Sequence, residues 1–199
     1  DHPDARQIYK LALKRRPINW KMPKKPVGQY GNRSGRDSRK LSYLVYNPRK
    51  KLNQAERREF REYERRLRYY LRKGWTLAFK RLINDPRVKK LCHPVQQDKF
   101  RANLAAGYYA AGRDEWALEW AERATRRSGE YLPEAHWTAG LASWRLGNYE
   151  NSRAHFDAVA NSDYASPWLD SAGAFWAARA SIKIRRPEEF GSYINMAAK

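Results

Sequence analysis

Apolar residues recur at helical spacing from residue 54 onward. In the segment 54–73 they fall on one stripe of a helix, which is formed by Phe60, Tyr63, Leu67, Tyr70 and Leu71. Asn53, followed by Glu56 three residues later, has the spacing of a capping box, and Gly74 is suited to end the helix. The pattern therefore predicts an amphipathic helix over 54–73 with one buried face.

The rest of the chain continues in short helices. The predicted ranges are 75–83, 87–92, 96–111, 114–127, 133–146, 149–160, 167–184 and 187–198. Glycines stand at helix ends where a left-handed residue is favoured, at Gly112, Gly129 and Gly147. Prolines stand at first-turn positions, where the missing N–H costs no hydrogen bond, at Pro133, Pro167 and Pro187.

The predicted helix pairs repeat along the chain. AAGRDEWALEWAERA around Gly112 aligns with RLGNYENSRAHFDAVA around Gly147 at an offset of 35 residues, and IRRPEEFGSYINMAA is a weaker third copy. A period near 34 residues is typical of tetratricopeptide-like (TPR-like) helical hairpins. We therefore expect an all-α fold, a TPR-like α-superhelix built as a solenoid of helical hairpins.

Tryptophans lie among many alanines in the segment 135–180. They are Trp137, Trp144, Trp168 and Trp176, and at helical spacing they are expected to fill the space between closely packed helices. A role in stacking on sugars is the weaker interpretation for Trp137, Trp144 and Trp176. Trp20 and Trp75 lie outside the repeat and are better placed to contact another molecule.

Residues 1–53 form a basic, largely irregular N-terminal arm in this interpretation. Prolines and glycines interrupt long helices there, although a short helix over 3–14 and a brief extended segment over 42–47 fit the pattern. Such an arm is expected to order only against the helical body or a partner. The predicted organisation is a 1–53 arm, a 54–94 amphipathic basic helix with connecting helices, and 95–199 helical repeats.

Charge is divided unevenly between the two halves of the chain. The net charge is +20, with 29 Lys and Arg against 9 Asp and Glu in residues 1–100, and 12 of each in residues 101–199. A surface of this sign attracts nucleic acid, anionic lipid or an acidic cell-wall polymer. The candidate polyanion-binding residues lie on the 54–73 helix and are Arg57, Arg58, Arg61, Arg65, Arg68 and Arg72. A merely solvated helix face is the competing interpretation.

Catalytic, metal and cofactor signals are missing from the sequence. Cys92 is the only cysteine and is expected to be a small buried hydrophobe, while His136 and His155 are expected to be satisfied structural histidines. The acidic residues, such as Asp114 and Glu134, fit first turns of helices better than a catalytic cleft. No catalytic, cofactor-binding or metal-binding residue and no cofactor is predicted. No apolar run is long enough to cross a membrane.

Two long segments of this sequence resemble one protein family. The segment PEAHWTAGLASWRLGNYENSRAHFDAVANSDYASPWLDSAGAFWAARA at 133–180 resembles the helical domain of soluble lytic murein transglycosylases, which are periplasmic enzymes that cleave peptidoglycan glycan strands. The segment at 84–129 also resembles that domain, and the likeness covers about residues 75–198. Residues 1–74 resemble nothing that we can name. The resemblance implies a periplasmic protein whose signal peptide has been removed.

The resemblance stops short of the enzymatic part. In that family the helical superhelix precedes a lysozyme-like catalytic domain whose acid is the Glu of a Glu-Ser motif, and no Glu-Ser dipeptide occurs in this sequence. The resemblance thus implies the scaffold without its catalytic residues, and it leaves enzymatic activity open.

Two hypotheses of function follow. The first is a non-catalytic, peptidoglycan-associated scaffold or docking module, with peptidoglycan or an envelope protein complex as its partner. The second is a helical-repeat protein, or a structural subunit of a larger complex, that binds nucleic acid through its basic N-terminal part. For the second, Trp20, Tyr30, Tyr43 and Tyr46 were candidates to stack on bases.

Overall fold

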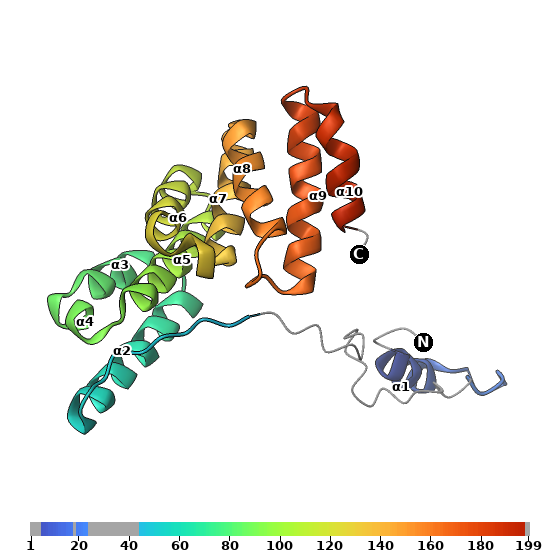
Figure 1. Cartoon of the computed structure of the whole chain (residues 1–199). Helices are drawn as coiled ribbons and strands as arrows, with labels where there is room; N and C mark the ends of the chain where they lie inside the picture. Colours follow the sequence, from blue (N-terminus) through green and yellow to red (C-terminus); the bar gives the residue numbers. More distant parts are fainter. Residues whose placement is uncertain (1–4, 18, 24–43, 198–199) are drawn as a thin grey trace. The chain divides into compact units, whose positions relative to one another are not determined.

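A computed structural model describes residues 5–17, 19–23 and 44–197, and the chain divides into two compact units, residues 1–40 and 41–199 (Figure 1). In the first unit, α1 spans Ala5–Arg15, close to the predicted helix at 3–14. Residues 3 and 4 of that prediction, residues 42 and 43 of the predicted extended segment, Tyr30 and Tyr43 lie outside the described residues. The described residues 44–47 belong to no helix or strand.

The described part of the second unit is helical and has no strand, so the all-α prediction is confirmed. Its helices are α2 Gln54–Arg72, α3 Thr76–Asn84, α4 Pro86–Leu91, α5 Pro94–Ala110, α6 Asp114–Ser128, α7 Pro133–Arg145, α8 Tyr149–Ala160, α9 Pro167–Lys183 and α10 Phe190–Ala197. Two single 3-10 turns separate some of them, η1 Gly129–Tyr131 and η2 Pro187–Glu189.

The last predicted helix, 187–198, was wrong at its start, because the chain first makes the 3-10 turn η2. In this turn the Glu189 carboxylate accepts a hydrogen bond from Ser181 Oγ at 2.9 Å and lies 3.3 Å from Arg153 Nη1. We attribute the tighter first turn to these contacts, which draw Glu189 toward α8 and α9.

Capping residues fix where the helices begin. Asn53 Oδ1 accepts from the N–H of Glu56 at 2.8 Å, and the Glu56 carboxylate accepts from the N–H of Asn53 at 3.1 Å, which confirms the predicted capping box. His93 and Gln96 form a second capping box at the start of α5, which was not predicted. Histidine is not among the preferred capping residues, so the sequence pattern carries little signal for this cap.

Four helix ends share one turn. Gly74, Gly112 and Gly147 adopt positive φ angles of 67°, 69° and 76°, and Arg185 adopts 60° at the corresponding place after α9. In each turn the following N–H reaches back to the helix, as in Arg113 N to Tyr108 O at 2.9 Å and Arg186 N to Ser181 O at 2.8 Å. The predicted left-handed positions at Gly112 and Gly147 are confirmed.

Gly129 was wrongly predicted to be left-handed. Its φ is −57°, in the right-handed helical region. What requires glycine here is space, because a Cβ would lie 2.6 Å from Nε2 of His136. A glycine between two helices can provide either a left-handed turn or room for a neighbouring side chain. Only the packing around it distinguishes the two.

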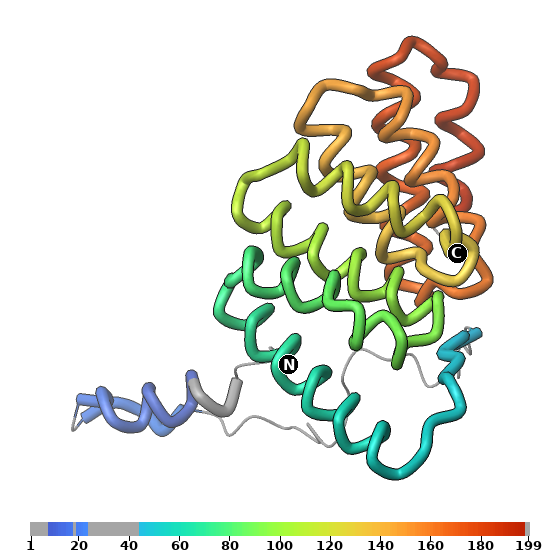
Figure 2. Tube along the Cα trace, turned by 90° about the vertical axis from the view of Figure 1, so that its left-hand side faces the viewer, coloured from blue at the N-terminus to red at the C-terminus, as the bar shows by residue number. Residues whose placement is uncertain are grey.

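Helices α5 to α10 pack in chain order, each against the next, and α5 also contacts α7 (Figures 1 and 2). Small residues allow these contacts. Gly140 faces the Phe156 ring and Gly173 faces Val159, at distances that leave no room for a Cβ. The α2–α4 part is built differently, since bulky side chains such as Phe60, Leu67 and Phe79 enter a core that also includes residues of α5 to α7.

The chain before α2 lies along the helical body. Leu44 N donates to Asp163 O at 3.0 Å in the loop before α9, the rings of Tyr46 and Tyr131 are 4.2 Å apart, and Lys50 Nζ donates to Lys90 O at 2.7 Å in α4. The expectation that the arm orders against the helical body is therefore met by residues 44–52. The contact also occupies Tyr46, one of the candidate stacking residues.

The tryptophans of the array pack as expected, with one exception. Trp137 and Trp176 contact the Phe156 cluster, and Trp144 lies edge-on to Trp176 with ring centroids 5.2 Å apart. The prediction that Trp168 fills space between helices was wrong, because its side chain is 71% exposed. Its ring meets that of Trp137 edge-on, with the centroids 6.0 Å apart. It stands at the second position of α9.

Candidate polyanion-binding surface

The six arginines predicted to bind a polyanion share one face of α2. At 3.6 residues per turn, Arg57, Arg58, Arg61, Arg65, Arg68 and Arg72 fall within about 100° of the helix circumference. All six side chains are exposed. We call this set the arginine face.

The opposite side of α2 packs on the body of the protein. Phe60 and Leu67 are buried, and Tyr63 and Tyr70 are partly buried against the same core. The prediction that Leu71 is buried with this stripe was wrong, because its side chain is 38% exposed. Because one side of α2 packs on the body of the protein, the arginines on its other side point toward solvent.

Two of the acidic residues on α2 are bound by neighbouring cations. Arg87 of α4 makes a bidentate contact with Glu59, with Nη2 2.7 Å and Nε 2.9 Å from its oxygens, and these hydrogen bonds lower the pKa of Glu59. Glu62 pairs with Arg65 at 3.0 Å. Within residues 44–197, Arg65 is the only arginine of the face that forms an ion pair, so most of the face keeps its positive charge.

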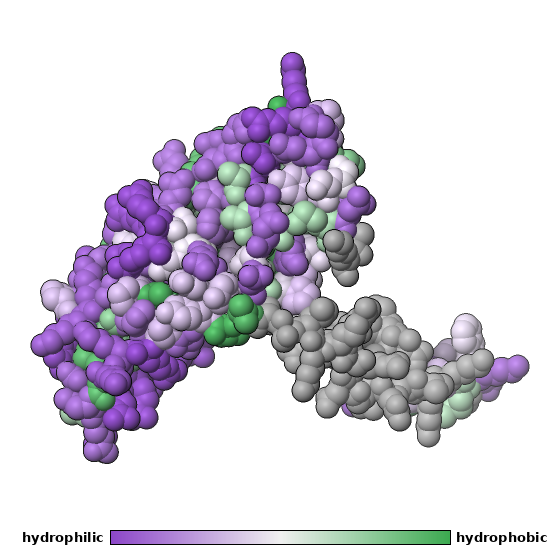
Figure 3. All heavy atoms as spheres, in the orientation of Figure 1, coloured by the Kyte–Doolittle hydropathy of each residue, from purple (hydrophilic) through white to green (hydrophobic). Residues whose placement is uncertain are grey.

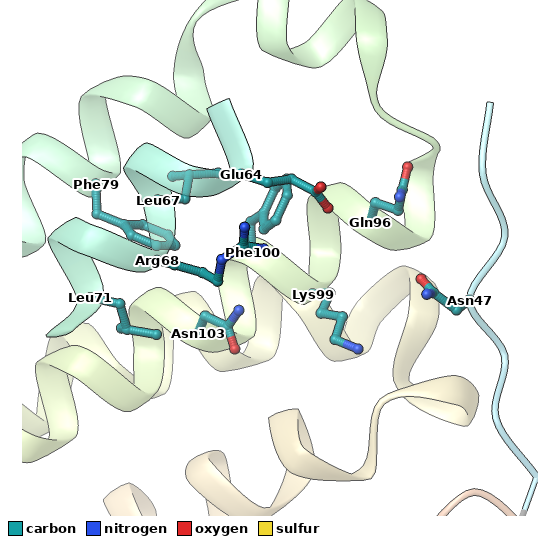
Figure 4. A pocket seen from close by; sticks show the side chains of 10 residues that line it. All are labelled: Asn47, Glu64, Leu67, Arg68, Leu71, Phe79, Gln96, Lys99, Phe100 and Asn103. Carbon is teal, nitrogen blue, oxygen red and sulfur yellow. The ribbon is translucent and has the colours of Figure 1, made fainter. Parts of the chain in front are cut away.

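A groove runs beside the arginine face, between α2, α5 and the extended segment before α2. It consists of two adjoining pockets of about 190 and 140 Å³ that share Glu64 and Gln96. Figure 4 shows the larger of the two. Its apolar floor includes Leu67, Phe79 and Phe100. Its cationic residues come from all three segments and are Arg49, Lys50, Arg57, Arg61, Arg68 and Lys99.

The groove brings together only part of the predicted site. Arg57, Arg61 and Arg68 line it, whereas Arg58, Arg65 and Arg72 lie on the arginine face outside it. The sequence did not point to Arg49, Lys50 or Lys99 as members of the same site. The signal was absent because Lys99 is more than 25 residues away from the arginines and joins them only through the α2–α5 contact.

Aromatic side chains continue the surface at the C-terminal end of α2. Trp75 is 50% exposed and its ring centroid lies 5.6 Å from that of Tyr69 and 6.0 Å from that of Tyr70. The prediction that Trp75 stands apart from the repeat core agrees with this position. Figure 3 shows mainly hydrophilic side chains over the helices nearest to α2 on the face in view.

The prediction that the acidic residues lie on helix surfaces or in first turns was wrong for one of them, Asp98. Asp98 of α5 is fully buried and accepts from Arg101 Nη1 at 2.6 Å, Arg127 Nε at 2.7 Å and Ser128 Oγ at 2.6 Å. Its charge is satisfied by two guanidinium groups and a hydroxyl, so it joins α5 to α6.

The two histidines of the array face one another. His136 Nδ1 and His155 Nδ1 are 2.9 Å apart, and burial lowers the pKa of each to about 4. The expectation of fully satisfied histidines was wrong for His155, because its buried Nε2 has no hydrogen-bond partner and Glu122 Oε1 is 3.9 Å away. Both rings are therefore neutral near pH 7.

Nucleophile and metal chemistry find no support among the described residues. Cys92 is buried, as predicted, and burial raises the pKa of its thiol to about 12. Within residues 5–17, 19–23 and 44–197, no group of three His, Cys, Asp or Glu side chains is arranged to hold a metal ion. In the same part of the chain, every helix is too short or too polar to span a lipid bilayer.

Comparison of the chain with protein-family models, with curated proteins and with solved structures finds no match. Function is therefore inferred from the residues and their geometry.

Proposed function

We propose that this chain is a non-catalytic helical scaffold that docks onto an anionic polymer through the arginine face of α2. The observation that carries the proposal is the gathering of six exposed arginines on one side of a helix whose other side is buried. A concentration of like charge costs self-repulsion, which a polyanion offsets. The neighbouring groove adds Arg49, Lys50 and Lys99 to the same surface.

We also propose that α5 to α10 form a TPR-like superhelix, a solenoid of helical hairpins. Three hairpins end their first helix in the same turn, at Gly112, Gly147 and Arg185, spaced by 35 and 38 residues. In such arrays each unit buries its apolar side only against its neighbours. The array then serves as a rigid support that presents α2.

Peptidoglycan is the polymer that we favour, with the periplasm as the site of action. Support comes from the resemblance of the segments 84–129 and 133–180 to the helical domain of lytic murein transglycosylases. Peptidoglycan peptides carry carboxylates, which guanidinium groups bind through paired hydrogen bonds. An envelope protein complex with an acidic surface would be held by the same chemistry.

Co-sedimentation with intact peptidoglycan sacculi tests this proposal. The charge-reversal variant Arg61→Glu/Arg68→Glu is expected to weaken binding at least tenfold, and binding of the parent chain should fall as salt rises. The matched control is Arg66→Glu/Lys73→Glu, which makes the same change of charge on α2 and at the residue that caps its C-terminal end, away from the arginine face. Equal loss in both variants would point to attraction by net charge alone, and no sacculus binding by the parent chain would remove the peptidoglycan assignment.

A second candidate function is binding of single-stranded nucleic acid. The observation in its favour is the partly exposed cluster of Tyr69, Tyr70 and Trp75 at the end of the arginine face, since bases stack on aromatic rings beside cationic grooves. Fluorescence anisotropy with a mixed-sequence oligonucleotide distinguishes the two. Nucleic-acid binding predicts that Trp75→Ala weakens oligonucleotide affinity about tenfold and leaves sacculus binding unchanged. A flat titration at low salt would exclude this candidate.

A further inference from the structure

A second cationic depression lies away from the arginine face. It is lined by Asn84 at the end of α3, Arg101 of α5, and Trp120, Arg123, Arg126 and Arg127 of α6, and it has a volume of about 290 Å³. None of these residues lines the groove beside α2. Its four arginines lie within residues 101–199, where acidic and basic residues balance, so they are a local concentration of charge.

Buried Asp98 holds two of these arginines in place. Arg101 uses Nη1 and Arg127 uses Nε to reach the Asp98 carboxylate, and Arg127 Nη2 also donates to Pro94 O at 2.8 Å. A guanidinium has five N–H donors, so each keeps donors that these bonds do not use. The two side chains are therefore fixed before any ligand arrives, which lowers the entropy lost on binding.

The remaining cations surround Trp120. The Arg123 guanidinium lies 5.0 Å and Lys80 Nζ 5.6 Å from the centre of the Trp120 ring, which is itself only 5% exposed. Arg123 Nη2 contacts Glu119 at 2.7 Å, while no ion pair within residues 44–197 involves Arg126. Five cations thus stand against the two carboxylates of Asp98 and Glu119.

We propose that this cluster, Arg101, Arg123, Arg126 and Arg127 around Trp120, binds a phosphate-type oxyanion. Guanidinium groups from two helices can each present parallel N–H donors to different oxygens of a tetrahedral anion. The ring of Trp120 is too covered to act as a platform for a base or a sugar, so recognition rests on the charged group itself. The proposal is independent of the scaffold function, because it shares no residue with the arginine face.

The competing role for the cluster is structural, since basic residues in the last turn of α6 also favour its helix dipole. Two-dimensional NMR of the ¹⁵N-labelled 199-residue chain separates the two roles. The probe is the indole N–H of Trp120, assigned with Trp120→Phe, during titration with inorganic phosphate. We expect a saturable shift with a midpoint on the order of 1 mM, as for a small, solvent-open site. Sodium chloride at equal ionic strength should give no saturable shift.

Variants then assign the effect to the cluster. Arg123→Ala/Arg126→Ala is expected to raise the midpoint at least about tenfold, and Arg126→Ala alone about threefold to tenfold. The melting temperature of Arg126→Ala should be unchanged, because no side-chain hydrogen bond or ion pair of Arg126 is found within residues 44–197. The matched control is Arg113→Ala, whose guanidinium also lies over a tryptophan, 5.7 Å from the centre of Trp116, but outside the depression. It should bind phosphate like the parent chain.

Two results would overturn the proposal: a shift that chloride reproduces, or a phosphate midpoint that Arg126→Ala leaves unchanged. A further arm identifies the source of the phosphate group, using vesicles of phosphatidylcholine with phosphatidylglycerol. Vesicle binding that Arg126→Ala weakens and Arg113→Ala does not would assign a lipid headgroup. Phosphate binding without such vesicle binding would assign a soluble phosphate.

Discussion

The α2–α4 part and the α5–α10 array use charge in opposite ways. On α2 the charged side chains face solvent, and the pairs they make, such as Arg87 with Glu59, lie at the surface. In the array, carboxylates are placed between helices, as Asp98 between α5 and α6 and Asp157 beside Tyr193 of α10. The first arrangement leaves charge available for a partner. In the second, the charged groups bind neighbouring helices to one another.

Packing differs in the same two parts. Large side chains fill the core beneath α2, whereas the array depends on alanines and glycines that bring helix backbones together. A change of charge on α2 should therefore alter binding, whereas removal of a carboxylate that lies between helices of the array should alter stability.

The largest expected effect is the loss of Asp98. Asp98→Ala leaves the partly exposed guanidinium groups of Arg101 and Arg127 without their shared carboxylate, and it leaves the buried Ser128 hydroxyl without its acceptor. Losing these three hydrogen bonds to a charged group costs about 3–5 kcal/mol of the free energy of unfolding. Urea unfolding followed by circular dichroism measures it. The matched change on the surface, Glu59→Ala, is expected to have a much smaller effect. Similar losses in the two variants would erase the distinction between the two parts.

Acid is expected to destabilise the array while the arginine face keeps its charge. The pKa values of His136 and His155 are lowered to about 4 in the folded chain, from 6.5 in the unfolded one, by burial and, for His136, by the facing ring of His155. The unfolded state therefore binds more protons between pH 6.5 and 4, and the stability present above pH 6.5 is lost as pH falls through this window. The loss is about 2 kcal/mol for each ring by pH 5, or roughly 3–4 kcal/mol for the pair.

Unfolding in urea at pH 7, 6 and 5 measures this dependence. In His136→Gln/His155→Gln the dependence in this window should flatten. A parent chain that is equally stable at pH 7 and pH 5 would contradict the prediction.

Close helix contact in the array predicts an unusual effect of adding a methyl group. In Gly173→Ala the Cβ would meet Val159 Cγ1 at 2.7 Å and the backbone N of Ala160 at 3.0 Å, so α8 and α9 must separate. We expect a loss of about 1–3 kcal/mol, although alanine is the better helix former. Gly191→Ala in α10, where nothing lies within 4 Å, is the control and should stabilise by up to about 1 kcal/mol. Thermal unfolding compares the pair.

The smallest effects concern the shared turn. Arg185→Gly removes a left-handed non-glycine residue after α9 and should stabilise by about 0.5–1 kcal/mol. Gly74→Ala places a side chain in the same conformation after α2 and should destabilise by about 1 kcal/mol, with no steric clash to confuse the result. Melting temperatures that move in the same direction for both variants would refute a common turn.

Much of the helical plan could be read from local signals. The Asn53 capping box, the glycines at 112 and 147 and the prolines at first turns depend on residues a few positions apart, and the structure places helix ends at or near each of them. Errors arose where one residue type serves two purposes. Gly129 provides room for His136 rather than a left-handed turn, and Arg185 makes that turn without a glycine.

The candidate site was only half predictable. Helical periodicity alone puts the six arginines of α2 on one face. Periodicity could not predict that Lys99 lines the groove, or that Asp98 binds both Arg101 and Arg127. These contacts depend on how α5 packs against α2 and α6.

By itself the sequence determined that the chain is helical, where most helices start and stop, and that the surplus positive charge lies in residues 1–100. These properties depend on local geometry and composition. Only the tertiary structure decided which charges are buried and which remain exposed, and that two histidines meet at 2.9 Å. The physical reason is that burial and ion pairing are set by contacts between helices distant in the chain, and periodicity within one helix carries no information about its neighbour.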